Sequence, residues 1–501
     1  MGTGVARASL PTVRDRAAVV SHASITPDRG RPLVVDLDGT LLRSDVLIEC
    51  VWAFLKTSPL RCWQLLIWLL RGGKAGLKAR LAAATNLDVT GLPYDASLLA
   101  QLAAERAAGR ALVLATATHQ RYAQAIADHL GCFDEVHATD GEVNLSATRK
   151  RDRLIAAFGE RGFDYAGNSR DDVPVWASAA RAWVVNPGRG VERVALAQGN
   201  VDRVIETRRG RLKVLSRALR LHQWLKNLLI FVPLLTAHHF GQPATTLAAG
   251  LAFVAFGLCA SSVYLLNDLI DLEDDRQHPS KRNRPLASGA LPLRWGVALC
   301  PVLLAGGALL AFGCLPLRFG LALLAYYALT LAYSLYLKRL VMVDVVVLAA
   351  LYTARIVAGA AAIGAPLSFW LLAFSMVMFL SLALIKRYAE LHALQARGLT
   401  KTRGRGYQSD DLALISSLGA ASGYLAVLVL ALYIQDRNTA LLYRHPPMIW
   451  PVCAILLYWV SRIWLIAHRG QMHDDPVLFA AKDRASWLMI AFCAACFWMA
   501  L

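Results

Sequence analysis

A long apolar run ends in the acidic stretch Asn267-Asp268-Leu269-Ile270-Asp271-Leu272-Glu273-Asp274-Asp275. Three of its carboxylates, those of Asp268, Asp271 and Asp275, have the spacing i, i+3 and i+7, which places them on one face of a helix. Such charges repel each other at a membrane boundary unless cations bind between them. Oxygen ligands at this spacing suit Mg²⁺, which commonly bridges protein carboxylates to substrate phosphates. The stretch therefore predicts a helix end that binds Mg²⁺, with a solvated acidic loop as the alternative.

Apolar spans follow one another from residue 221 to the C-terminus, each near the roughly 20 residues that a helix needs to cross the hydrocarbon core. They predict an all-α polytopic membrane domain over residues 214–501. Hydrophobic residues make up 56% of the chain although its formal net charge is +18, so we interpret the basic excess as loops beside anionic lipid and not as nucleic-acid binding. We count about nine spans: 221–239, 246–267, 293–313, 318–337, 341–363, 367–385, 413–434, 447–467 and 485–501.

Basic side chains gather in alternate loops of this domain. The loops after the second, fourth, sixth and eighth spans are rich in lysine and arginine, whereas the other loops are poor in both. By the positive-inside rule, the basic loops and the N-terminal half of the chain face the cytoplasm, and the C-terminus lies outside. We therefore expect an integral, multi-pass protein of the cytoplasmic membrane, surrounded by membrane lipids.

The N-terminal half has a different pattern. Short apolar runs alternate with amphipathic stretches over residues 31–190, which is typical of an α/β domain. Residues 1–30 are expected to form a flexible tail, and the charged residues 191–213 a linker. The insertion 45–95 is interpreted as a helical cap, either plainly buried or in contact with the membrane surface. The expected strands are Leu33–Val35, Ala111–Ala115, Tyr165–Ala166 and Ala182–Val185.

Two carboxylates follow the first expected strand, in the run Val34-Val35-Asp36-Leu37-Asp38-Gly39-Thr40. Phosphoryl transfer through an aspartyl phosphate needs one carboxylate as nucleophile and a second group that protonates the leaving oxygen and activates water. A strand-end turn is the alternative. The functional interpretation is favoured because further polar groups follow in order: Thr116 ends a second strand and Lys150 follows a turn, and Asn168 and Asp172 follow a third strand.

In this order of motifs, residues 32–190 resemble the haloacid dehalogenase phosphatase superfamily. The resemblance implies a Rossmann-like fold in which Asp36 is the nucleophile and Asp38 the general acid and base. It implies further that Thr116 and Lys150 hold the phosphate. The superfamily usually has aspartate where Asn168 stands, so reduced metal affinity is expected, although an amide oxygen remains a ligand for a hard cation. The implied Mg²⁺ ligands are Asp36, Asp38, Asn168 and Asp172.

The acidic stretch in the membrane half is followed by His278-Pro279-Ser280-Lys281-Arg282-Asn283-Arg284-Pro285. The acidic helix end and this loop resemble the NDxxDxxxD signature of the UbiA superfamily, and the resemblance covers the chain from about residue 215 to its end. It implies that Asp268, Asp271 and Asp275 hold Mg²⁺ and a diphosphate leaving group. Lysine and arginine can clamp the outer oxygens of a diphosphate. The assisting residues are Asn267, Lys281 and Arg284.

The loop after the sixth span departs from the commoner branch of that superfamily, which carries a second acidic cluster there. Here the loop begins with Lys386 and Arg387, which suit a lipid phosphate better than a second Mg²⁺, with ordinary positive-inside charge as the alternative. Asp344 and Arg355 are charges inside spans, which we interpret as functional or as a structural pair. These segments resemble the decaprenyl-phosphate phosphoribosyltransferase branch. The substrate-binding residues that it implies are Lys226, Tyr333, Lys338, Asp344, Arg355, Lys386 and Arg387.

Three hypotheses about function follow. In the first, the membrane domain transfers phosphoribosyl from phosphoribosyl diphosphate to a polyprenyl phosphate, and the phosphatase domain removes the 5-phosphate of the product. In the second, it moves a prenyl group from a prenyl diphosphate to an aromatic or other small acceptor, which requires a replacement for the missing acidic cluster. In the third, the chain is a transporter or lipid-binding protein with an inactive soluble domain. The sequence determines neither the length of the lipid nor the oligomeric state, for which a homo-oligomer is one alternative.

Overall fold

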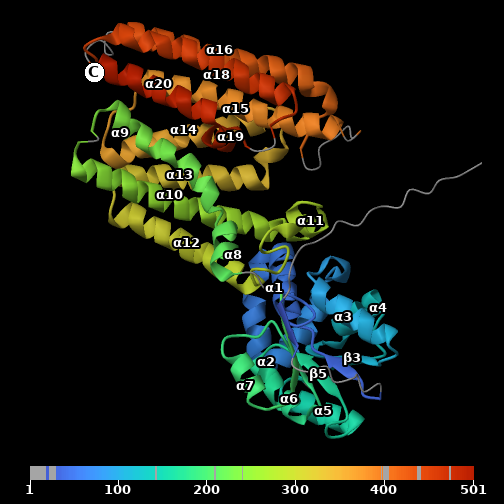
Figure 1. Cartoon of the computed structure of the whole chain (residues 1–501). Coiled ribbons are helices and arrows are strands. Elements are labelled where there is room, and N and C mark those ends of the chain that lie inside the picture. The colour runs from blue at the N-terminus through green and yellow to red at the C-terminus, as the bar shows by residue number, and fades with distance from the viewer. Residues whose placement is uncertain are drawn as a thin grey trace, which may run out of the picture. The chain divides into compact units, whose positions relative to one another are not determined.

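The computed structural model of the chain describes residues 18–21, 30–140, 144–207, 210–239, 241–396, 398, 405–436, 442–472 and 475–501 (Figure 1). They form two compact units. The first unit comprises Met1–Ala218 and Asp268–Val297, and the second comprises Leu219–Asn267 and Ala298–Leu501. The acidic segment that follows the second expected span thus belongs to the same compact unit as the N-terminal half.

A seven-stranded sheet forms the centre of the first unit, with the strand order β1-β7-β6-β5-β2-β3-β4. Neighbouring strands are parallel, except that β1 and β7 are antiparallel. The strand order and parallel pairing are those of a Rossmann-like α/β domain. The strands are β1 (Ala18–Ser21), β2 (Leu33–Val35), β3 (Leu112–His119), β4 (Glu135–Thr139), β5 (Asp164–Gly167), β6 (Ala182–Val185) and β7 (Val201–Glu206).

Helices cover both faces of this sheet because successive side chains of a strand point to opposite faces. Leu33 and Val35 of β2 lie in one buried core, and Val34 lies in another. The first core is closed by α1 (Val46–Thr57), α2 (Trp63–Ala84), α3 (Ala96–Ala107) and α4 (Gln120–Leu130). The second is closed by α5 (Thr148–Phe158), α6 (Val173–Ser178) and α7 (Val191–Leu196). The remaining helices of the unit are η1 (Pro59–Arg61), η2 (Val89–Gly91), η3 (Arg170–Asp172), α8 (Arg211–Ala218), α11 (Leu272–Gln277) and η5 (Lys281–Asn283).

The sheet continues past residue 190, where the charge of the sequence indicates a linker. Residues 191–213 contain α7, β7 and the start of α8 instead. The charged residues of β7 are compatible with a strand because the guanidinium of Arg203 stacks over the ring of Trp183 at 4.4 Å, and Asp202 accepts a hydrogen bond from the same indole. In the expected tail, β1 pairs with β7; the other residues of 1–29 lie outside the described part of the chain.

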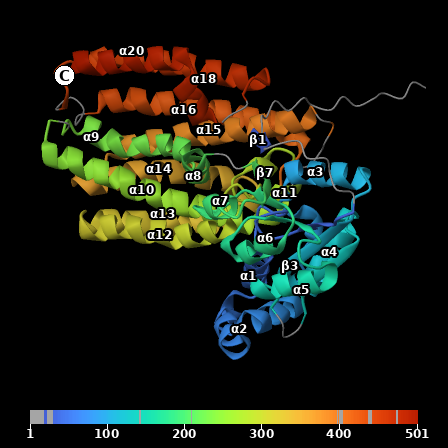
Figure 2. The same ribbon diagram turned by 60° about the horizontal axis from the view of Figure 1, so that its bottom comes forward.

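The second unit is a bundle of helices that run side by side in both views (Figure 2). α10 ends, and α12 begins, in residues of the first unit. The helices are η4 (Leu221–Phe231), α9 (Val232–Thr236), α10 (Pro243–Ile270), α12 (Leu293–Gly313), α13 (Leu317–Leu335), η6 (Leu337–Arg339), α14 (Val343–Ile363), α15 (Phe369–Gln395), η7 (Ser409–Asp411), α16 (Leu412–Gln435), η8 (Pro446–Ile449), α18 (Trp450–His468), α19 (Pro476–Lys482) and α20 (Arg484–Ala500).

Every expected span is helical, but only seven of the helices within the described ranges are long and apolar enough to cross a membrane. The first expected span is a 3-10 helix, η4, that leads into the five-residue α9, and the last, α20, has 17 residues. Glycine lets η4 approach α14 closely, since a Cβ on Gly359 would lie 2.1 Å from the carbonyl oxygen of Ile230. Hydropathy alone identifies the apolar segments, but it does not indicate how much of each segment forms a regular α-helix.

Candidate active sites

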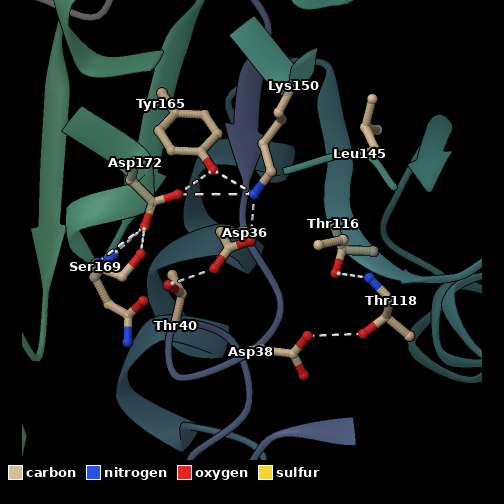
Figure 3. Close-up of polar contacts among 12 residues, drawn as sticks. Asp36, Asp38, Thr40, Thr116, Thr118, Leu145, Lys150, Tyr165, Ser169 and Asp172 are labelled. Atoms are coloured by element: carbon tan, nitrogen blue, oxygen red, sulfur yellow. Dashed lines mark hydrogen bonds and ion pairs between the residues drawn. The ribbon is translucent and has the colours of Figure 1, made fainter. Parts of the chain in front are cut away.

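The first site lies in the α/β domain at the carboxyl ends of its central strands (Figure 3). Asp36 follows β2, Thr116 lies within β3 and Asn168 follows β5. Since β3 and β5 flank β2 in parallel, side chains at their carboxyl ends converge, which is where open α/β sheets bind ligands. The structure thus brings together the residues that the sequence places at the ends of separate strands.

Asp36 is held by a network that also contains Lys150, Tyr165 and Asp172 (Figure 3). Lys150 Nζ lies 2.6 Å from Asp36 Oδ1, and it donates to Tyr165 Oη at 2.9 Å. Tyr165 in turn donates to Asp172 Oδ1 at 2.7 Å, and Thr40 donates to Asp36 Oδ2. Burial raises the pKa of Asp36 to about 6, although Lys150 lowers it. At neutral pH the carboxylate is ionised, as a nucleophile requires.

Asp38 has hydrogen-bond partners of its own. Its Oδ1 accepts from the backbone N–H of Val46 at 2.8 Å, and its Oδ2 accepts from the hydroxyl of Thr118 at 2.7 Å. Burial, helped by the charge of Asp45, raises the pKa of Asp38 to about 7. A carboxyl group with a pKa near the working pH can both give and take a proton, as a general acid and base must.

The oxygen donors at this site suit a Mg²⁺ ion, with three of the four ligands that the sequence predicts available to it. Asp172 Oδ2 accepts from the backbone N–H of Asn168 and from both the N–H and the hydroxyl of Ser169, at 2.9–3.0 Å. With Oδ1 bound to Tyr165, this carboxylate fixes the loop that carries Asn168. Gly39 leaves space for the amide of Asn168, whose Nδ2 would lie 2.1 Å from a Cβ there. The residues that could hold the ion are therefore Asp36, Asp38 and Asn168, all oxygen donors.

Thr116 is fully buried, and its hydroxyl accepts the N–H of Thr118. Sequence reasoning missed Thr118 and Tyr165. The alternation of threonines in the run Ala115-Thr116-Ala117-Thr118 could have indicated the first, because residues i and i+2 of a strand share a face. An open pocket of about 230 Å³ adjoins Thr118, and Lys78 of the cap lines it too.

The acidic segment, also in the first unit, is not one continuous helix as its spacing predicts. α10 ends at Ile270, Asp271 lies at the N-cap position without a capping side-chain hydrogen bond, and α11 begins at Leu272. The segment nevertheless brings two of the predicted carboxylates together. Arg284 Nη1 contacts Asp268 Oδ1 at 3.1 Å and Asp275 Oδ2 at 2.5 Å. The helix break changes the route of the chain but keeps positions i and i+7 close.

Among the described residues no three acidic, histidine or cysteine side chains form a ready metal site, but one carboxylate oxygen of this segment suits a cation. Asp275 is 1% exposed, and its Oδ1 is buried and accepts no hydrogen bond, with Lys281 Nζ 3.9 Å away. Burial raises the pKa of Asp275, against Arg284 and Lys281, which lower it. A buried carboxylate oxygen without a hydrogen-bond donor is energetically costly, and a hard cation would satisfy it.

Helix α1 of the α/β domain contacts this acidic segment directly. Glu49, 3% exposed, pairs with both terminal nitrogens of Arg276, at 2.6 and 3.2 Å. The indole N–H of Trp52 donates to the carbonyl oxygen of Leu269 at 2.8 Å. α1 begins at Val46, whose N–H binds Asp38. One short helix therefore touches the phosphatase-type site at its start and the acidic segment along its side.

In the second unit, Lys226 of η4 and Lys386 of α15 come together on one carboxylate. Asp475 Oδ2 lies 2.8 Å from Lys226 Nζ and 3.2 Å from Lys386 Nζ. Its Oδ1 accepts from Tyr352 Oη at 3.3 Å and caps α19 through Val477 N–H. Burial alone would raise the pKa of Asp475, but the two lysines hold it well below its usual range. We call Lys226, Tyr352, Lys386 and Asp475 the open cluster, because the side chain of Lys386 is 33% exposed.

Arg387, the next residue, turns into a separate buried cluster. Its guanidinium pairs with Asp344, and both side chains are 0% exposed. Tyr407 donates to Asp344, and Glu390 accepts from Arg387. The sequence suggests that Asp344 pairs with Arg355, and this is wrong: the partner of Asp344 is Arg387. Arg405 also pairs with Glu390, whose side chain is 36% exposed. We call Asp344, Arg387, Glu390, Arg405 and Tyr407 the closed cluster, because its central pair, Asp344 and Arg387, is fully buried.

Arg355 binds neutral partners. Its Nε donates to Asn227 Oδ1 at 3.0 Å and its Nη2 to Tyr326 Oη at 2.9 Å, and its guanidinium lies 5.6 Å from the ring centre of Tyr352. A different predicted residue, Asn267, donates to Ser334 at 3.0 Å. Tyr333 and Lys338 are half-buried, in α13 and η6. Sequence reasoning missed several members of these clusters: Tyr352, Asp475, Glu390 and Tyr407. A lone acidic residue in a loop, such as Asp475, carries no distinctive spacing.

An α/β phosphatase-type domain and a bundle of membrane-length helices, each with its own site, define a polytopic membrane enzyme of two parts. Comparison with known families agrees with both parts. Residues 228–482 match the UbiA prenyltransferase family, and residues 33–176 match the haloacid dehalogenase-like hydrolases. The chain belongs to the UbiA prenyltransferase family and carries a haloacid dehalogenase-like domain at its N-terminus.

Two relatives cover different shares of the chain. The uncharacterized protein y4nM of Sinorhizobium fredii is 39% identical over 477 residues, which are 95% of this chain and 92% of y4nM. Decaprenyl-phosphate phosphoribosyltransferase of Mycobacterium tuberculosis is 34% identical over 227 residues, which are 44% of this chain and 74% of that enzyme. Among solved structures, a UbiA homolog from Archaeoglobus fulgidus bound to DMAPP and Mg²⁺ is 18% identical, with a TM-score of 0.44, over 56% of this chain and 98% of that one.

Proposed function

We propose that the membrane domain transfers a 5-phosphoribosyl group from phosphoribosyl diphosphate to a polyprenyl phosphate, and that the haloacid dehalogenase-like domain removes the 5-phosphate from the lipid product. Both active sites face the cytoplasm in this proposal. The similarity to the mycobacterial phosphoribosyltransferase supports the first reaction. The fusion supports the second, because a tethered phosphatase meets the product at an effective concentration of roughly millimolar.

The observation that carries the proposal is the open cluster. Among the described residues, Lys226 and Lys386 share a single carboxylate, so this part of the cluster has two cations and one anion in a half-buried place. Each ammonium has three donors and gives one of them to Asp475, so donors remain for another anion. A phosphate acceptor requires such cations, whereas an aromatic acceptor does not. The charge of the cluster therefore favours a lipid phosphate as the acceptor.

In the transfer, an oxygen of the lipid phosphate attacks the anomeric carbon of ribose, the bond from that carbon to the diphosphate oxygen breaks, and diphosphate leaves. Mg²⁺, when bound by Asp268, Asp271 and Asp275, would neutralise the charge that develops on the leaving group. Arg284 and Lys281 bind the outer diphosphate oxygens. Lys226 and Lys386 orient the attacking phosphate. The protein contributes positioning and electrostatic stabilisation, and no covalent intermediate is needed.

In the hydrolysis, Asp36 attacks the phosphorus of the 5-phosphate, and Asp38 protonates the departing ribose oxygen. Asp38 then takes a proton from water, which attacks the aspartyl phosphate and releases inorganic phosphate. Lys150 neutralises the phosphate oxygens. Tyr165 and Asp172 hold Lys150 and the Asn168 loop in place. Because Asn168 replaces a carboxylate, this site should need a higher Mg²⁺ concentration than its Asn168→Asp variant.

Prenyl transfer to a small acceptor is the competing function. It requires a second acidic cluster after α15, and in the described part of that loop the acidic residues are Asp410 and Asp411. Asp411 accepts from the N–H of Gln408 and so caps η7. Its carboxylate is engaged in forming the start of α16, which favours the phosphate acceptor.

The proposal is tested with the purified full chain, Mg²⁺, labelled phosphoribosyl diphosphate and polyprenyl phosphate, following label into the organic phase. Asp271→Asn should abolish transfer, whereas Asp274→Asn, at an exposed position of the same segment, should leave it intact. Asp36→Asn should preserve transfer but leave the extracted lipid with its 5-phosphate.

Two results would contradict the proposal separately. Turnover of a prenyl diphosphate on an aromatic acceptor, with no labelled lipid from phosphoribosyl diphosphate, would replace the first reaction. The second result concerns the 5-phosphate of the labelled lipid. If the wild type leaves it in place at Mg²⁺ concentrations at which Asn168→Asp removes it, the second reaction is excluded and the first stands.

A further inference from the structure

Helix α2 of the cap, labelled in Figure 2, carries large apolar side chains that are exposed. Trp63 is 57% exposed, Leu66 60% and Leu70 75%. Their spacing of i, i+3 and i+7 places them on one side of the helix. Leu60, which directly precedes the helix, and Leu69 extend the patch. Large apolar side chains that are contiguous and exposed mark interaction sites in soluble domains.

This patch is separate from the face that α2 uses for folding. Leu65 and Trp68 point inward and pack against the core of the α/β domain, with the ring of Trp68 5.2 Å from that of Phe54. The first ten residues of α2 are thus apolar on two sides, although a helix at the surface of a soluble domain needs one apolar stripe. The outward side must meet something other than its own domain.

The charge around the patch indicates what it meets. From residue 59 to 84 there is no acidic side chain, and there are five basic ones. Lys78 turns inward and donates to Asn144, but the other four are exposed. A helix with leucine and tryptophan on one side and arginine and lysine beside it lies in the interface of an anionic bilayer. The exposed basic residues are Arg61, Arg71, Lys74 and Arg80.

We propose that residues 60–71 of the cap insert into the headgroup region of an anionic lipid bilayer. The helix departs from helical geometry at Gly73 (φ 56°), and its second half carries Lys78 to the pocket beside Thr118. One end of α2 meets lipid and the other lines the phosphatase-type site. A substrate whose phosphate lies at the bilayer surface would therefore reach the phosphatase-type site next to α2, the helix that holds the domain at that surface. The lipid contact itself does not depend on which substrate is used.

The test is quenching of tryptophan fluorescence by brominated lipid, with the full chain in nanodiscs of phosphatidylcholine and phosphatidylglycerol. The chain has 13 tryptophans, so the signal of one is obtained by difference. The difference in fluorescence between the wild type and Trp63→Phe is the signal of Trp63. Brominated lipid should quench this signal, because Trp63 faces lipid. Trp68 lies on the inward side of the same helix and is the matched control. The difference in fluorescence between the wild type and Trp68→Phe should not be quenched. The quenched component should fall when phosphatidylglycerol is omitted or ionic strength is raised.

Leu66→Asp combined with Leu70→Asp should abolish the Trp63 component, while thermal unfolding stays as in the wild type, because both side chains are exposed in the folded domain. The proposal is overturned if Trp63 is quenched no more than Trp68. It is equally overturned if Trp63 is protected from soluble iodide only in discs that hold two chains, which would make a second copy of the chain the partner. Neither result would bear on the transfer of label to lipid, so the two proposals fail independently.

Discussion

The open and closed clusters of the second unit contain the same kinds of side chain and differ in their balance of charge. In the closed cluster, Arg387 and Arg405 face the carboxylates of Asp344 and Glu390, and no part of Arg387 or Asp344 is exposed. In the open cluster, two lysines face one carboxylate, and one of the lysines is a third exposed. Adjacent residues of one helix, Lys386 and Arg387, thus have different surroundings. A cluster whose charges balance around a fully buried ion pair indicates a structural role, and one with an excess of cations indicates ligand binding.

The largest effect is expected in the closed cluster. Arg387→Met leaves Asp344 buried without a cation, which typically destabilises a protein by about 3–5 kcal/mol. Thermal unfolding in detergent should show a large drop in Tm, and transfer activity should fall with the folded fraction. The double variant Asp344→Leu with Arg387→Met should recover most of the Tm, because a hydrophobic pair can replace a buried ion pair. An unchanged Tm in the single variant would contradict the structural role.

A large effect on activity alone is expected in the open cluster. Lys386→Met leaves Asp475 paired with Lys226, so Tm should stay near that of the wild type. A hydrogen bond to a charged group contributes about 1.5–3 kcal/mol, so kcat/KM for the lipid phosphate should fall by roughly 10- to 100-fold. Steady-state kinetics with each substrate varied in turn measure this. The contrast would fail if Lys386→Met lowered Tm as much as Arg387→Met does, and kcat/KM fell only in proportion to the folded fraction. Both clusters would then have a structural role.

Much of this contrast lies beyond the sequence. The apolar spans, the parallel strands and the residues at their carboxyl ends could be predicted, because periodicity and strand-end motifs are local. Arg387 could not be predicted as the partner of Asp344, because it is 43 residues away on another helix and Arg355 is closer in sequence. Asp475 escaped notice for the same reason, as its role depends on lysines contributed by η4 and α15. The break at Asp271 shows that spacing alone does not establish a continuous helix.

An intermediate effect is expected at Arg355, whose partners are neutral. Arg355→Lys keeps the charge but loses the planar fork that reaches Asn227 and Tyr326 together. Leaving one buried acceptor without its donor costs about 1–3 kcal/mol, so Tm should fall less than in Arg387→Met. Kinetics should show a smaller loss than in Lys386→Met. A loss of activity equal to that of Lys386→Met at unchanged Tm would assign Arg355 to the substrate.

The smallest effect is a stabilisation by simple anions. Inorganic phosphate that binds the open cluster stabilises the folded chain by about 1.4 kcal/mol at ten times its Kd. Phosphate should therefore raise the Tm of the wild type by a few degrees relative to chloride at equal ionic strength, and not that of Lys226→Met combined with Lys386→Met. An equal rise in both would mean that the anion acts elsewhere, and would weaken the assignment of the open cluster as a phosphate site.

The contact between α1 and the acidic segment has a consequence for the order in which the chain is made. Glu49 and its partner Arg276 are separated by 227 residues, and Trp52 and Leu269 by 217. At about 5–20 residues per second, the ribosome delivers these partners roughly 10–45 s after α1. For that time the nascent domain presents a glutamate without its arginine and an exposed indole. Folding of the N-terminal domain is therefore completed only after α10, the first of the membrane-length helices, has been synthesised.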